Sequence, residues 1–325
     1  MKIGITYDVK EEYGFEKLDL RFTDFLAMEE VSFIKESLEG LGHHVTLIGN
    51  VIALNEYLRK NTDLDLVFNM SWGYRGRNRE GLIPAVLESY NIPYTGTDAY
   101  GCSSCLDKLH IKLLAQSFNI PTPDYFVVTK HNKYHYLKEC PLSFPLIVKP
   151  NSQGEGMGVA KVDNCREYRI YIEKILNEYE DSVLCEEYID GIDITVPLIE
   201  REGHLDTLGI LEILDKNMQP LDIYDAETKM FGETIKRRAS VPAKSEQRLS
   251  QYTKQIFAAI QGHDFGRADF KFSVQNGTPY FLEMAPLPSL AYHNSYISCA
   301  MEYGYTPKDV FKMIIDSALY RKNGK

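Results

Sequence analysis

The order of apolar segments in the first hundred residues constrains the fold more than any other feature of the chain. Short β-type runs occur at residues 2–6, 45–48, 64–69 and 92–95, and apolar residues with helical spacing lie at 28–41 and at about 80–90. Strands that alternate with helices favour an open parallel sheet with helices on its faces. We therefore expect this arrangement for residues 1 to about 100.

The rest of the chain predicts an α+β body. An amphipathic helix over 108–118 precedes β-type runs at 126–128, 146–149 and 183–186, and a charged helix is expected at 166–180. The pattern then favours antiparallel strands over 193–200 and 206–213. At roughly 150 residues per domain, 325 residues correspond to two domains or to three small ones.

Composition and charge exclude several functional classes. The chain has 36 Lys and Arg against 46 Asp and Glu, and the resulting net charge of −10 disfavours a nucleic-acid partner. No stretch approaches 18 apolar residues, so no membrane-spanning helix is expected. Asp8, Glu11 and Glu12 interrupt any signal-peptide core, and six scattered cysteines favour free thiols in a reducing compartment. We therefore expect a cytoplasmic protein without a membrane partner.

A glycine-rich loop follows the β-type run that ends near Lys149. Gly154, Gly156 and Gly158 occupy alternate positions, which frees the backbone to turn and to present N–H groups, while the lysine supplies a point charge for phosphate. A phosphate-binding loop is one interpretation of this pattern. A plain β-hairpin turn is the other.

Two carboxylates lie on neighbouring segments of the C-terminal third. Asp269 belongs to a β-type run, and Glu283 ends the next run after the turn at 275–278. Alternation along the two strands places both side chains on comparable faces of a hairpin, where they could hold Mg²⁺. The alternative is an exposed pair of acids.

Three polar segments have two interpretations each. The acids Glu186, Glu187 and Asp193 could accept hydrogen bonds from an adenine amino group and ribose hydroxyls, or they could be solvated surface charge. The loop 222–232 could be a lid over phosphates or a mobile surface loop. The basic segment 72–79 could clamp an anionic carboxylate substrate or be a solvated loop.

Taken in this order, these residues resemble the ATP-grasp superfamily and, within it, the D-alanine–D-alanine ligase-like enzymes. The resemblance covers nearly the whole chain, and its most specific stretches are 67–69 with Gly73, 80–81, 92–97, 106–108 with Lys112, 144–150, 186–191, 224–229 and 267–269. It implies three domains: an N-terminal open parallel α/β domain over 1–106, a small central α+β domain over 107–189, and a C-terminal α+β domain over 190–325. ATP would bind between the last two.

The resemblance also implies roles for individual residues. The nucleotide would contact Lys108, Lys149, Gly154, Glu155, Gly156, Gly158, Glu186, Glu187, Ile189, Asp193 and Lys229. Asp193 would take the ribose-binding position, and Asp269 with Glu283 would hold Mg²⁺. Arg267 would stabilise the negative charge at the acyl centre, with Lys229 and Ser295 as further catalytic residues and Ser295 near the second substrate.

The implied reaction is ATP-dependent, ADP-forming ligation of a small carboxylate to an amine through an acyl phosphate. Several positions depart from the pattern of the family near the substrate. Glu155 replaces a serine, Met230 a tyrosine and Trp72 a histidine, and residues 7–11 lack the glutamate that holds the first D-alanine. These departures predict that the carboxylate substrate is an amino acid or a related acid other than D-alanine.

Two departures affect the metal site and leave the activity open to other interpretations. Ala285 replaces a metal-ligating asparagine, and Ser289 replaces a glycine. We expect an active ligase with an altered metal demand. The alternatives are a nucleotide-binding protein that has lost ligation, and a small-molecule kinase. A homodimer is a further expectation from the resemblance.

Overall fold

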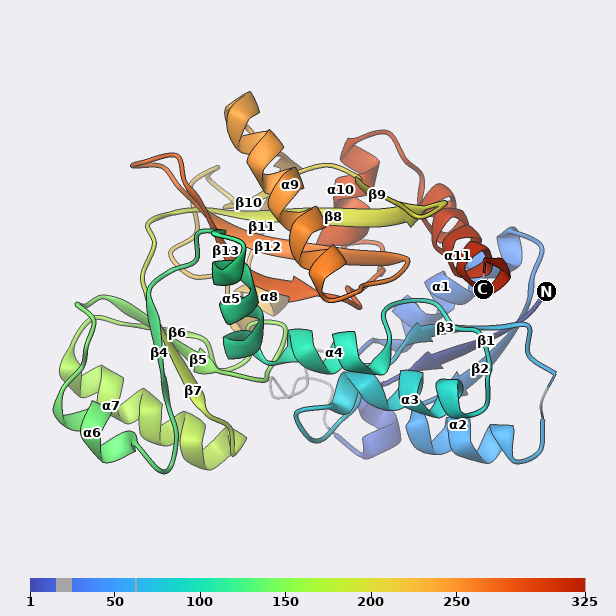
Figure 1. Cartoon of the computed structure of the whole chain (residues 1–325), viewed down its shortest axis with the longest axis horizontal. Coiled ribbons are helices and arrows are strands. Elements are labelled where there is room, and N and C mark those ends of the chain that lie inside the picture. Colours follow the sequence, from blue (N-terminus) through green and yellow to red (C-terminus); the bar gives the residue numbers. More distant parts are fainter. Residues whose placement is uncertain (16–24, 62, 325) are drawn as a thin grey trace.

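A computed structural model of the chain describes residues 1–15, 25–61 and 63–324. Among them the strands form three sheets, built from successive parts of the chain within residues 2–70, 125–187 and 191–285 (Figure 1). Within the described residues, no helix combines the length and the apolar character needed to cross a membrane.

The N-terminal sheet is parallel, as the sequence predicts. Its order is β2-β1-β3, and it consists of β1 (Lys2–Tyr7), β2 (His44–Gly49) and β3 (Leu66–Met70). The connecting segments hold α1 (Met28–Gly40), α2 (Val51–Leu58), α3 (Leu82–Ser89) and the 3₁₀ turns η1 (Lys10–Tyr13) and η3 (Arg79–Gly81). Burial of Ile3, Ile5 and Phe68 between the helices is the driving force for this layer.

The fourth strand expected at 92–95 is a wrong prediction. Tyr94 makes only an isolated parallel bridge with Val67, through hydrogen bonds of Val67 N–H to Pro93 O and of Thr95 N–H to Val67 O. Gly96 follows at a φ of 93° and turns the chain away from the sheet. The ladder therefore ends after one bridge.

The central sheet is antiparallel and has the order β4-β7-β5-β6. Its strands are β4 (Tyr125–Val128), β5 (Leu146–Pro150), β6 (Ala160–Val162) and β7 (Val183–Glu187). The helices of this part are α6 (Lys133–Lys138) and α7 (Cys165–Lys174), the latter continued by the π-helix η4 (Ile175–Tyr179). The preceding helices α4 (Ala99–Leu106) and α5 (Lys108–Ser117) pack instead against the C-terminal sheet, at strand β13 (Pro279–Ala285). Tyr168 of α7 is fully buried against Phe126 and Phe144. The domain boundary predicted at 106–107 stays a prediction, and it falls between α4 and α5.

The C-terminal sheet has the order β11-β10-β8-β12-β13, with β9 paired to β8. Its strands are β8 (Gly191–Arg201), β9 (His204–Thr207), β10 (Leu211–Asp215), β11 (Thr234–Arg238), β12 (Phe265–Ser273) and β13 (Pro279–Ala285). The single strand expected over 206–213 is therefore two strands. They separate at Gly209, against which the Tyr303 ring packs so closely that no Cβ would fit.

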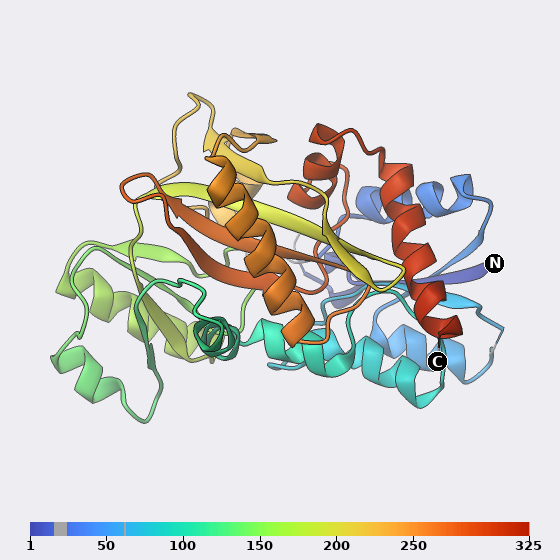
Figure 2. The ribbon, with the colours of Figure 1, turned by 45° about the horizontal axis from the view of Figure 1, so that its top comes forward.

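Helices cover this sheet and join it to the N-terminal layer. They are α8 (Ala226–Phe231), α9 (Ala243–Ala259), α10 (Ser295–Glu302) and α11 (Pro307–Asn323). Figure 2 shows α9 crossing the sheet, while α11 lies beside the N-terminal layer. Phe311 of α11 contacts Phe33 and Phe68, so the first and last parts of the chain share one hydrophobic core.

Candidate functional site

A cavity lies between the central and C-terminal sheets. Thirteen of the predicted residues line it: Lys108, Lys149, Glu155, Gly156, Glu186, Glu187, Ile189, Asp193, Lys229, Arg267, Asp269, Glu283 and Ser295. The tertiary structure thus brings together side chains from residues 108 to 295. Gly154 and Gly158 do not line the cavity. Gly158, at a φ of 67°, instead packs against Pro150 and Tyr179.

The glycine-rich loop joins β5 to β6, so it is a hairpin connection and also a wall of the cavity. Gly156 has a φ of 77°, and an added Cβ would lie 2.8 Å from the backbone of Asp225 and Ala226. The Ala226 N–H donates to Gly156 O at 3.2 Å. The segment 222–232, expected as a lid or a mobile loop, is therefore in backbone contact with the glycine-rich loop.

An ion pair reinforces this contact between the loop and α8. The Lys229 ammonium lies 3.1 Å from the Glu155 carboxylate and 5.1 Å from the centre of the Tyr224 ring. Burial raises the pKa of Glu155, but Lys229 and Arg267 outweigh it, so the net pKa is lowered and the group is ionised. Glu155 has a φ of 48°, a conformation that favours glycine, so the backbone is strained at this position.

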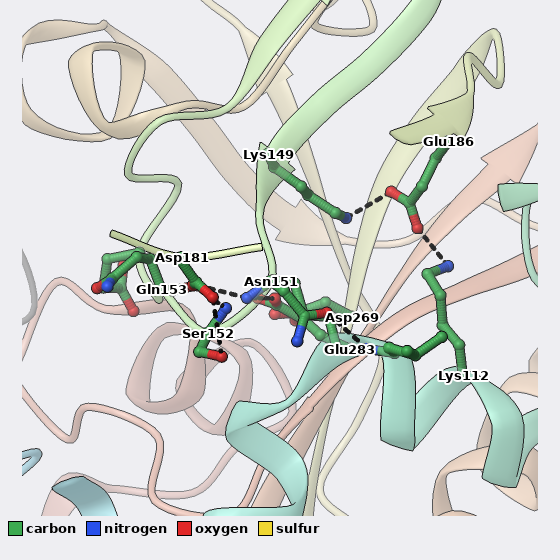
Figure 3. A network of polar contacts seen from close by, with 12 residues as sticks. Lys112, Lys149, Asn151, Ser152, Gln153, Asp181, Glu186, Asp269 and Glu283 are labelled. Carbon is green, nitrogen blue, oxygen red and sulfur yellow. Dashed lines mark hydrogen bonds and ion pairs between the residues drawn. The ribbon is translucent and has the colours of Figure 1, made fainter. Parts of the chain in front are cut away.

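Glu186 lies between two lysines (Figure 3). Its carboxylate forms ion pairs with Lys112 and, at 2.5 Å, with Lys149. Lys112 also donates to Thr122 Oγ1 at 2.5 Å and is fully buried. Burial lowers the pKa of Lys112 to about 8, against the opposing effect of Glu186. Sequence reasoning did not place Lys112 in the site, although its spacing of four from Lys108 puts both on one face of α5.

A set of hydrogen bonds holds the start of α5 against the glycine-rich loop (Figure 3). Asn151 Nδ2 donates to Asp107 at 2.8 Å, and Asn151 Oδ1 accepts from the Leu109 N–H at 2.9 Å. The Lys108 ammonium donates to Gln153 O and lies 3.4 Å from Glu283. Lys108 is therefore positioned by the loop and by β13 together.

The two predicted metal-binding acids are direct neighbours in the β12–β13 hairpin. Asp269 pairs with Glu283 across the ladder, as the alternation predicts. Asp269 accepts from the Arg267 guanidinium at 2.7 Å and from Thr195 at 2.7 Å, so the acids are not simply exposed. Burial raises the pKa of Glu283, but the nearby lysines and Arg267 bring it down to about 2.

Two neighbouring carboxylates suit a hard cation that also takes phosphate and water oxygens, so the side chains present fit Mg²⁺. Among the described residues no group of three or more His, Cys, Asp or Glu side chains is arranged as a metal site. Ala285, opposite Arg267 in the ladder, adds no oxygen ligand from its side chain. Within the described part of the chain, Asp269 and Glu283 are thus the two side chains that could hold the metal.

Asp193, expected at the ribose position, lines the cavity but is paired with a cation that sequence reasoning missed. The Lys271 ammonium lies 3.0 Å from Asp193 and donates to Leu221 O at 3.1 Å. Burial raises the pKa of Asp193, and Lys271 opposes this effect. Lys271 faces Asp193 directly because the two residues pair in the β8–β12 ladder.

The basic segment 72–79 contacts the start of the glycine-rich loop, the residue before α5 and the segment after β13, and it does not line the cavity. Arg79 is buried and donates to Ser152 O at 2.7 Å, while Arg77 forms an ion pair with Asp107 at 2.7 Å. The Trp72 indole donates to Leu287 O at 2.8 Å. These side chains brace the glycine-rich loop and the segment after β13.

Comparisons with known proteins agree with this geometry. A family model described as the D-ala D-ala ligase C-terminus matches residues 114–316, which is more than half of the chain. The chain belongs to the D-alanine–D-alanine ligase family. It is 30% identical over 294 residues to a D-alanine–D-alanine ligase of Thermotoga petrophila, covering 89% of this chain and 91% of that protein. It is also 29% identical over 264 residues to the uncharacterized protein y4sG of Sinorhizobium fredii, covering 80% and 76%.

Solved structures of this ligase family share the fold. The chain matches a D-alanine–D-alanine ligase from Bacillus anthracis complexed with ATP at a TM-score of 0.76 and 24% identity, over 100% of both chains. It matches the VanG D-Ala:D-Ser ligase of Enterococcus faecalis at a TM-score of 0.76 and 20% identity, over 98% and 99%.

The predicted ATP-grasp fold is therefore confirmed. As a member of this ligase family the chain is an ATP-dependent, ADP-forming ligase that forms carbon–nitrogen bonds, with ATP and Mg²⁺ as cofactors.

Proposed function

We propose that the chain activates a small carboxylate, an amino acid or a related acid other than D-alanine, as an acyl phosphate and joins it to an amine. One observation carries the proposal. Among its charged side chains, a single cavity brings together four cations and two acids that suit this chemistry, namely Lys108, Lys149, Lys229, Arg267, Asp269 and Glu283. This is the charge pattern that phosphoryl transfer between two anions requires.

The chemistry follows from the poor leaving group of a carboxylate. Transfer of the γ-phosphoryl group to one carboxylate oxygen forms the acyl phosphate and ADP. Attack of the amine then forms the carbon–nitrogen bond as phosphate leaves, and the amine loses a proton. Lys108, Lys149 and Lys229 would neutralise the phosphates, and Arg267 would stabilise the oxyanion at the acyl carbon.

Asp269 and Glu283 would hold Mg²⁺, which neutralises charge on the phosphate oxygens when bound. Arg267 already contacts Asp269 through two nitrogens, with Nη2 at 2.7 Å and Nε at 2.9 Å. The guanidinium is therefore oriented by the same carboxylate that would bind the metal. This contact would tie the position of the guanidinium to that of the metal.

The substrate proposal is supported by Glu155. Its ionised carboxylate lines the cavity beside Lys229 and is close enough to Arg267 for the guanidinium to lower its pKa. A neutral hydroxyl at residue 155 would not compete with the substrate and the phosphates for the positive charges of Lys229 and Arg267. The extra negative charge changes which carboxylate can approach.

The test is phosphate release from Mg·ATP by the purified protein. The panel contains L- and D-amino acids and small carboxylates, singly and in pairs, with mass detection of products. We expect release that needs both a carboxylate and an amine, a product lighter than their sum by one water, and little release with D-alanine alone.

Lys149→Ala should abolish this release, whereas Lys244→Ala, an exposed lysine on α9, should not change it. Preferred formation of D-alanyl-D-alanine would contradict the substrate proposal. Tight ATP binding without release for any pair would instead favour a nucleotide-binding protein that has lost ligation, which is the function that Ala285 favours.

A further inference from the structure

A second cavity, of about 600 Å³, opens away from the catalytic cavity described above. It is bordered by the connection between β9 and β10, by one face of α9, by Arg238 at the end of β11 and by Tyr303. The proposed reaction uses none of these residues. Binding sites for small molecules commonly have volumes of roughly 300–1,000 Å³, so a small ligand fits this space.

Arg238 is the cation of this second cavity. Its guanidinium lies 4.7 Å from the centre of the Tyr303 ring. The ring is held in turn, because its hydroxyl donates to Ile210 O at 3.2 Å and its edge packs against Gly209. Among the described residues, no carboxylate lies within ion-pair distance of this guanidinium. A guanidinium that is fixed on an aromatic face and keeps its N–H groups free is suited to bind a carboxylate.

The wall formed by α9 carries an acid and a row of amides. Glu246 lies in the first turn of α9 and has no ion-pair partner within the described part of the chain. Gln247, Gln251 and Gln255 follow at intervals of four, which places them on one face of the helix, and all three line the cavity. An amide side chain donates and accepts hydrogen bonds, as a peptide group does. This wall therefore suits an ammonium group and a peptide group.

Two elements connect the second cavity with the catalytic one. Lys236 and Arg238 alternate on β11, so their side chains leave the same face of the strand. Lys236 lines the catalytic cavity and donates to His293 O at 2.8 Å. Helix α10 begins at Ser295 in the catalytic cavity, and Tyr303 follows its last residue in the second cavity. A ligand that contacts Arg238 and Tyr303 therefore acts on both elements.

We propose that the second cavity is a regulatory site for a zwitterionic α-amino acid or short peptide. Arg238 binds the carboxylate of the ligand, and Glu246 on the opposite wall binds its ammonium group. The three glutamines bind the peptide group when the ligand is a dipeptide. This site goes beyond the proposed function, and ligand binding at it does not require ligation.

Hydrogen exchange detected by mass spectrometry locates the binding, because different segments line the two cavities. The probes are glycine, alanine, glycylglycine and alanylalanine at millimolar concentration, with N-acetylglycylglycinamide as the uncharged control. We expect the zwitterions to slow exchange at least twofold around residues 207–210 and 246–255, and the uncharged control to have no effect. A stronger effect of the dipeptides than of the amino acids would identify a peptide as the ligand, and equal effects would identify a free amino acid.

Three variants test the two charges. Arg238→Gln and Glu246→Gln should each remove the slower exchange caused by the zwitterions. Arg248→Gln, at an exposed arginine of α9 that does not line the cavity, should retain it. Thermal unfolding of the three variants should lie close to that of the wild type, since these side chains are at the surface.

Regulation is measured as the kcat of phosphate release at saturating substrates. Addition of the zwitterion that binds should change this kcat at least twofold in the wild type and in Arg248→Gln, and not in Arg238→Gln.

Unchanged exchange with every zwitterion, or slower exchange that persists in both charge variants, would overturn the binding site. Binding without a change in kcat would overturn its regulatory role. A protein that releases phosphate with no substrate pair would contradict the proposed function alone, because the exchange experiment tests the second cavity without ligation.

Discussion

At the scale of single residues, two lysine side chains beside the cavity form ion pairs with the same glutamate. Lys112 and Lys149 both contact Glu186, and of these two lysines only Lys149 lines the cavity. Lys112 would then remain as the partner that keeps Glu186 ionised and in place. It therefore acts through Glu186, as a positioning residue.

Lys112→Met should raise the KM for ATP about tenfold and change the KM of the carboxylate substrate little, because Glu186 would lose one of its two buried partners. Breaking a buried ion pair on one side costs about 3–5 kcal/mol, so the free energy of unfolding should also fall. Steady-state kinetics and urea unfolding measure the two effects. Lys138→Met, an exposed lysine at the end of α6, is the control; an unchanged KM for ATP in Lys112→Met would refute the positioning role.

At the scale of elements, the glycine-rich loop and the α8 segment contact each other and together form part of the cavity wall. Backbone atoms of Gly156 and Ala226 bond directly, and the Glu155–Lys229 pair lies beside them. Because of these contacts, a side chain at residue 156 would shift Lys229, although the two residues are far apart in sequence.

Gly156→Ala should lower kcat/KM for ATP at least tenfold. The new Cβ would meet the backbone of Asp225 and Ala226 at 2.8 Å and force the segments apart. The positive φ adds about 1 kcal/mol of backbone strain. Hydrogen exchange should show faster exchange in 222–232. Gly277→Ala is the matched control because Gly277 has a φ of 67° with open space around it; equal losses in both variants would mean that strain alone is responsible.

At the scale of the whole molecule, Asp264 connects the first and last thirds of the chain. This fully buried carboxylate accepts from the Gly96 N–H at 2.8 Å, from Ser317 at 2.9 Å and from Arg321 at 2.9 Å. Arg321 also donates to Tyr94 O at 2.7 Å. The N-terminal layer is thereby fastened to α11 and to the start of β12.

Asp264 should make stability depend on pH between about 4 and 6. Burial raises its pKa from 3.8 to about 6, against the opposing effect of Arg321, so the folded protein holds this proton more tightly than the unfolded chain. The protonated Asp264 therefore stabilises the folded protein, and this contribution to the free energy of unfolding is fully present below pH 3.8, the pKa of Asp264 in the unfolded chain. It decreases by about 3 kcal/mol as the pH rises through 6.

Urea unfolding of the wild type and of Asp264→Asn at pH 4 to 7 measures this contribution as a difference curve. The difference should fall by about that amount across the range. Gln251→Asn, at an exposed and uncharged position of α9, should give a flat difference because it changes no titrating group. A flat difference for Asp264→Asn as well would contradict the prediction.

Sequence alone determined the features whose cause is local. Three such features were predicted: the parallel N-terminal sheet, the glycine-rich loop after Lys149, and the position of Asp269 and Glu283 on the same face of a hairpin. Each follows from hydrophobic periodicity and turn residues within a short stretch of sequence. The family resemblance added residues such as Lys229 and Arg267, which do line the cavity.

Only the tertiary structure decided which charges are neutralised and which remain for a ligand. Lys112 meets Glu186, Arg79 reaches Ser152, and Lys236 joins Ser295 at the cavity end, all across long stretches of sequence. The helical spacing of Lys112 or the strand position of Lys236 does not specify such partners. The interaction of a charge depends on distance and burial in space, and both are set by how the three sheets pack.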